Sequence, residues 1–187
     1  MISGKNFISS TIGKKIMVAI SGLLFCFFLL FHFANNLIIF TGSDNFNFLV
    51  SSLEKIKPLV RVLEVLLLAI LVTHITNTII LTIKAKKASN ISKEEAGSKH
   101  SSFSSRTMFF SGSILFIFIV THLSTFWYNF QIIDDHNSYY RIVTDSQLGF
   151  GNIFITILYL LAMIFLGFHI KHGFSSALVT LGISSTS

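Results

Sequence analysis

The chain alternates between long apolar runs and shorter polar stretches. Four runs are long enough to cross a hydrocarbon layer of about 30 Å, which takes roughly 20 residues of helix. They cover residues 16–40, 59–83, 108–130 and 152–170. The sequence lacks the alternating ten-residue segments of a membrane barrel, whereas a helix satisfies its own backbone polar groups without water. The pattern therefore predicts an all-α, polytopic transmembrane helical bundle with four spanning helices, forming a single membrane domain over residues 1–187.

The composition agrees with a membrane protein. Hydrophobic residues make up 52% of the chain, charged residues only 12%, and the mean hydropathy is +0.73. A soluble domain of this size carries about 25% charged residues. The first apolar run follows several lysines, as in a signal peptide, but it is longer than a signal's apolar region of about 7–15 residues and no small-residue cleavage site ends it. We therefore expect an uncleaved spanning helix.

The charges are distributed unevenly between the connections. Residues 84–107 carry six Lys or Arg against two Glu, whereas residues 131–151 carry three Asp against one Arg. The positive-inside rule then assigns the N-terminus, residues 84–107 and Lys171 to the cytoplasmic side. We find neither a phosphate-binding glycine loop nor an internal repeat, and no feature of the sequence points to nucleic acid.

Histidines provide the candidate chemistry. One lies in each predicted span: His32, His74, His122 and His169. The other three are His100 and His136, in polar connections, and His172, just past the fourth span. An ionisable residue inside a membrane is costly and marks a functional site, although a single one can also serve as an interhelical hydrogen-bonding group. A histidine in each of four spans favours a shared function.

The depths of these histidines suggest two pairs. At 1.5 Å per residue from the basic ends of the helices, His32 lies ~24 Å, His122 ~21 Å and His74 ~14 Å into the layer. His169 lies close to the predicted end of its helix, or deeper if that helix continues past residue 172. His32 and His122 would then form an outer pair, and His74 and His169 an inner pair.

Two separate levels fit haem better than zinc. A closed zinc site needs four ligands at one point, whereas haem iron needs only one or two axial ligands from the protein. The pattern therefore predicts two stacked b-type haems, each held by two histidines. Gly22 and Gly112 fall near the inner level, where they leave room for either a haem face or a closely packed helix.

Several short stretches also match a known family. In chain order they are Ile12-Gly-Lys-Lys, Ser21-Gly-Leu-Leu, Phe31-His-Phe-Ala-Asn-Asn, Arg61-Val-Leu-Glu64, Thr73-His74, Thr121-His122, Phe168-His169-Ile-Lys-His-Gly173 and Thr180-Leu-Gly182. Over residues 10–183 the chain resembles the di-haem cytochrome b membrane-anchor subunit of succinate dehydrogenase and fumarate reductase, a succinate:quinone oxidoreductase.

The resemblance implies a role in electron transport. A subunit of this family passes electrons between an iron–sulfur subunit and membrane quinone, and its partners are that subunit and a flavoprotein. The chain would contribute to the enzyme complex without a dicarboxylate site of its own. It would lie in the inner (cytoplasmic) membrane of a bacterium, with a cytoplasmic N-terminus. Its cofactors would be two haem b, and quinone its substrate.

The resemblance also assigns residues. His74 and His169 match the iron ligands of the haem nearer the soluble subunits, and His32 and His122 match those of the outer haem. Arg61 and Glu64 would lie beside the outer haem or an outer quinone site. The arginine would pair with haem propionates and the carboxylate would exchange quinone protons, unless the two form only an interfacial ion pair at positions i and i+3.

The family usually has five spanning helices, so the prediction of four suggests a truncated or split chain. Two other functions remain open. One is the di-haem cytochrome b subunit of another quinone-linked oxidoreductase, such as a nitrate reductase or a hydrogenase. The other is a transporter with an intramembrane histidine relay.

Overall fold

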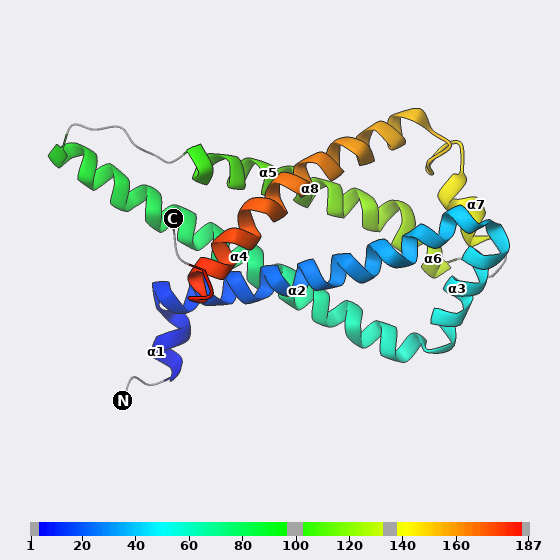
Figure 1. Cartoon of the computed structure of the whole chain (residues 1–187), viewed down its shortest axis with the longest axis horizontal. Helices are drawn as coiled ribbons and strands as arrows, with labels where there is room; N and C mark the ends of the chain where they lie inside the picture. The colour runs from blue at the N-terminus through cyan, green and yellow to red at the C-terminus, as the bar shows by residue number, and fades with distance from the viewer. Residues whose placement is uncertain (1–3, 97–102, 133–137, 185–187) are drawn as a thin grey trace. The chain divides into compact units, whose positions relative to one another are not determined.

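The computed structural model describes residues 4–96, 103–132 and 138–184 (Figure 1). Its helices in chain order are α1 Gly4–Ser9, α2 Thr11–Leu37, the 3-10 turn η1 Ile38–Thr41, α3 Ser43–Lys55, α4 Lys57–Ala96, α5 Phe103–His122, the π-helical turn η2 Leu123–Trp127, α6 Tyr128–Ile132, α7 Tyr139–Thr144 and α8 Ile153–Thr180. Within the described ranges every regular element is helical, which confirms the all-α prediction.

Four helical stretches are long and apolar enough to span a membrane. They are Thr11–Thr41, Lys57–Ala88, Thr107–Ile132 and Ile153–Thr180. Each coincides with one predicted span, so the chain is a multi-pass membrane protein. Large apolar side chains on these helices, such as Phe27 and Leu30, are exposed, as on a surface that faces lipid tails.

The helices start and stop for local reasons. Gly42 has φ +106°, which favours glycine, and it separates η1 from α3. Pro58 lies in the first turn of α4, where no intrahelical partner for its missing N–H is required. Asn152 precedes α8, and its Oδ1 accepts a hydrogen bond of 2.9 Å from the backbone N–H of Phe154. The predicted fourth span therefore began one residue early, at the cap.

The turn before α8 is held by Asp145. Its Oδ1 accepts hydrogen bonds of 2.8 Å from the backbone N–H groups of Leu148 and Gln147. These bonds favour the charged carboxylate, so they lower the pKa of Asp145 below its usual value. In the connection between α7 and α8, the Asp145 side chain thus accepts the backbone hydrogen bonds that a helix would otherwise provide.

Two helices extend beyond the prediction. The fourth was expected to end near residue 170, but α8 continues to Thr180 because residues such as Ala177 and Leu178 keep its apolar character. His169 is therefore about 16 Å from the end of its helix rather than beside it. Residues 84–96, predicted to start a loop, continue α4, because lysine, alanine and glutamate are strong helix formers.

The described chain divides into two compact units. The first comprises the described residues of 1–28, 64–108 and 170–187, and the second those of 29–63 and 109–169. In the second unit α3 packs beside α7 (Figure 1, cyan and yellow). A cluster of buried side chains joins these helices to the spans: Phe46, Phe126, Tyr139, Val143 and Tyr159. This cluster supports the segments that carry His32 and His122.

The charge asymmetry makes a testable prediction about topology. We expect a reporter fused within residues 84–107 to be cytoplasmic and one fused within residues 131–151 to be outside, because positively charged connections are retained on the cytoplasmic side. Paired alkaline phosphatase and green fluorescent protein fusions measure this. Reversed signals would contradict both the orientation and the assignment of inner and outer histidines.

Candidate functional site

The second unit brings the rings of His32 and His122 together edge to face. His32 lies on α2 and His122 is the last residue of α5. Their ring centroids are 5.8 Å apart and their planes are nearly perpendicular, at 88°. An iron with two axial imidazoles, each bond about 2 Å long, places the two centroids roughly 6–6.5 Å apart. The separation of the two rings is therefore close to the one that two axial imidazoles of a single iron require.

Aromatic side chains surround His122. Phe118 stacks on its ring with a centroid distance of 5.8 Å, and Phe126 approaches edge-on at the same distance. The Oη of Tyr159, on α8, is 3.3 Å from Nδ1 of His122. The π-helical turn η2 begins at the next residue, and such turns are common at functional sites. With Nδ1 beside the phenol, Nε2 is the nitrogen that remains for a ligand.

His74 is oriented by a serine of the neighbouring helix. Its Nδ1 is 2.9 Å from the Oγ of Ser21, and both residues belong to the first unit. The Ser21 hydroxyl lies 3.0 Å from the carbonyl oxygen of Val18. A serine has a single proton to donate, so when it donates to Val18 it accepts from Nδ1–H of His74. That tautomer leaves the lone pair of Nε2 available to a metal.

His169 has the same kind of partner. Its Nδ1 is 3.1 Å from the Oγ of Ser111, on α5, and both residues belong to the second unit. Ser21 and Ser111 are both buried, with 5% of their surface exposed. A hydrogen-bond partner at the other ring nitrogen fixes the ring orientation of a metal-ligating histidine. The pairing of His74 with His169 stays a prediction, because the two lie in different units.

The two glycines of interest lie beside these imidazoles. A Cβ atom at Gly22 would lie 3.6 Å from Cε1 of His74, and one at Gly112 would lie 3.5 Å from Cε1 of His169. These are ordinary contact distances, so a larger side chain would meet the ring. Each glycine thus packs beside a histidine of the next spanning helix, and its use at a haem face stays a prediction.

Sequence reasoning missed the two serines, although a signal for them exists. Ser-Gly is followed by histidine at the same spacing in α2 and α5, from Ser21 to His32 and from Ser111 to His122. Eleven residues are close to three helical turns, about 16 Å, so serine and histidine lie on the same face of each helix. The same short motif therefore recurs in the first and third spans.

Arg61 and Glu64 lie on α4. The guanidinium of Arg61 donates a hydrogen bond to the amide oxygen of Gln131 and lies over the ring of Trp127, 5.5 Å from its centroid. These three residues belong to the second unit, whereas half-buried Glu64 belongs to the first. The contacts hold a positive charge near the ends of two spanning segments. A role in binding propionate or quinone stays a prediction.

The three remaining histidines are not among the proposed ligands. His172 is exposed, and His100 and His136 lie outside the described residues. Among the described residues, no three His, Cys, Asp or Glu side chains come together as a metal held by protein alone requires. No protein-family model, curated protein or solved structure matches the chain. The functional inference therefore depends on the four histidines and their partners.

Proposed function

We propose that this chain is the haem b-containing membrane anchor subunit of a succinate dehydrogenase or fumarate reductase, passing electrons between an iron–sulfur subunit and membrane quinone. The observation that carries the proposal is the facing pair His32 and His122, with ring centroids 5.8 Å apart. One haem would be held by this outer pair, and the other by the inner pair His74 and His169.

The partners of the imidazoles support this function. Three of the four rings have a hydroxyl oxygen within hydrogen-bond distance of Nδ1: His74 with Ser21, His169 with Ser111 and His122 with Tyr159. A histidine that binds iron must be neutral and must present one fixed nitrogen. A hydroxyl at Nδ1 leaves Nε2 for an iron, which supports axial ligation. Because hydroxyl groups also pass protons, the haem content of the native protein distinguishes this function from a transporter relay.

A bound haem would supply reversible one-electron chemistry at its iron. The chain's own residues would hold the axial imidazoles and exclude water with their aromatic surroundings, which keeps the iron from reacting with other ligands. At the outer end, Arg61 would offer a positive charge to a propionate, and Glu64 would exchange protons with quinone. Gln131 and Trp127 would position the arginine.

Purification from native membranes tests the proposal. We expect two haem b per chain, with reduced α-bands of b-type haem, and copurification of a flavoprotein and an iron–sulfur protein. The control is a His172→Ala chain, which should retain both haems because this exposed residue is not a proposed ligand.

Each alternative function has its own outcome in the same experiment. Haem without a flavoprotein would assign the chain to another quinone-linked oxidoreductase. The absence of haem from the native protein would overturn the proposal in favour of a transporter.

A further inference from the structure

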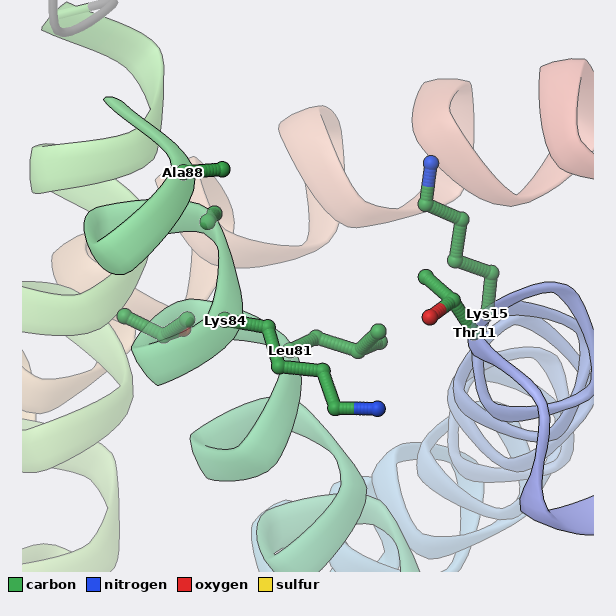
Figure 2. A pocket seen from close by; sticks show the side chains of 7 residues that line it. Thr11, Lys15, Leu81, Lys84 and Ala88 are labelled. Carbon is green, nitrogen blue, oxygen red and sulfur yellow. The ribbon is translucent and has the colours of Figure 1, made fainter. Parts of the chain in front are cut away.

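The first unit contains a pocket between α2 and α4 that is lined by none of the four candidate histidines. Its volume is about 530 Å³. Thr11 and Lys15 line it from α2, and Leu81, Lys84 and Ala88 line it from α4 (Figure 2). All of these residues belong to the first unit. The pocket therefore combines two ammonium groups and a hydroxyl with an apolar wall.

The position of the pocket along both helices is informative. Lys15 directly precedes the apolar run of α2, and Lys84 directly follows the apolar run of α4. Both lysines are exposed, and in Figure 2 the side chain of Lys84 extends from α4 toward α2. The ends of the apolar runs are where we expect the boundary between the hydrocarbon layer and water, with the phosphate groups of lipids.

None of the described residues that line the pocket is acidic. An anion in the pocket would therefore meet Lys15 and Lys84, from different helices, with no carboxylate among the described lining residues. The hydroxyl of Thr82 is engaged with the carbonyl oxygen of Thr78, at 2.8 Å, which leaves Thr11 as the lining hydroxyl on the facing helix. The small side chain of Ala88, with Ala85 a turn earlier, keeps the space beside α4 open.

We propose that this pocket binds the phosphodiester headgroup of an anionic phospholipid from the surrounding leaflet. Lys15 and Lys84 contact the phosphate, Thr11 donates a hydrogen bond to it, and the glycerol and upper acyl carbons lie against Leu81 and Ala88. A free phosphate ion would use only the polar half of the pocket. The apolar wall and the location at the membrane boundary select the lipid, and the inference does not depend on bound haem.

Lipid binding to the purified full-length chain tests this site. Native mass spectrometry and thermal unfolding are measured in detergent with added phosphatidylglycerol or phosphatidylcholine. We expect phosphatidylglycerol to bind more tightly and to raise the Tm more. The double variant Lys15→Gln/Lys84→Gln should weaken phosphatidylglycerol binding about 30-fold, which corresponds to about 1 kcal/mol per lysine.

A matched control separates the pocket from general surface charge. The variant Lys86→Gln/Lys87→Gln also removes two positive charges, both within a turn of Lys84 on α4, but neither residue lines the pocket. It should retain most of the preference for phosphatidylglycerol. An equal loss in both double variants would overturn the proposal in favour of diffuse electrostatic attraction.

Two further measurements keep the test decisive if the lysine variants fold poorly. Ala88→Leu fills the pocket without changing charge, and it should also weaken phosphatidylglycerol binding. Retention of wild-type affinity by folded Ala88→Leu would show that the lipid binds elsewhere. Inorganic phosphate should neither displace phosphatidylglycerol nor raise the Tm by the same amount. If it did both, the site would be one for small anions rather than for lipid.

Discussion

Replacement of His32 or His122 by alanine is expected to remove or perturb the same haem, the outer one. Each change removes one axial imidazole and leaves a cavity beside a five-coordinate iron, so the affinity for that haem should collapse. The facing arrangement of the two rings, 5.8 Å apart, is the reason to expect a shared phenotype. Haem content should fall from two per chain to about one, with the same α-band and the same redox transition lost in both variants.

The inner pair gives the complementary result. His74→Ala and His169→Ala should share a second phenotype that differs from the first, because ligation and burial set haem potentials over a wide range. His100→Ala, His136→Ala and His172→Ala serve as controls and should keep both haems. The measurement is haem per protein together with potentiometric titration of every variant. A His32→Ala phenotype that matched His74→Ala instead of His122→Ala would disprove the two-level arrangement.

The spans were predictable because hydropathy alone decides them. A run of about 20 apolar residues has few alternatives to a spanning helix, since backbone groups in lipid must bond within the segment. Their ends were less predictable. Asn152 was assigned to a span although it is a cap, and α8 continued past residue 170 through Gly173 to Thr180. Such ends depend on side-chain hydrogen bonds and packing, which a hydropathy pattern does not contain.

The candidate site was predictable to a different extent. The four histidines stood out because ionisable groups are rare in lipid. Their hydroxyl partners did not, since serine is common in spans and Ser21 meets His74 only through the packing of α2 against α4. The repeated spacing of Ser-Gly and histidine in α2 and α5 was available as a signal. The spacing shows, however, only which residues share one face of a helix. Which residue of another helix packs against that face depends on the tertiary structure.

The glycines beside His74 and His169 lead to the last expected result. Gly22→Leu and Gly112→Leu should each abolish binding of the inner haem and leave the outer haem in place. A Cβ at these positions already lies 3.6 and 3.5 Å from the imidazole Cε1, so the further carbons of leucine must displace the ring. Since an axial ligand that is misplaced by about 1 Å no longer holds its geometry, we expect the same loss as in His74→Ala.

Alanine at the same positions is the matched control. The Cβ of Gly22→Ala or Gly112→Ala makes an ordinary contact with the ring, so both variants should keep two haems with at most a shift in potential. Redox titration and haem content again report the outcome. If Gly22→Leu removed the outer haem, or if Gly112→Leu and Gly22→Leu affected different haems, then His74 and His169 would not ligate one iron. If both leucine variants kept two haems, displacing the rings of His74 and His169 would have no effect on haem binding. The proposal that this inner pair ligates a haem iron would then be wrong.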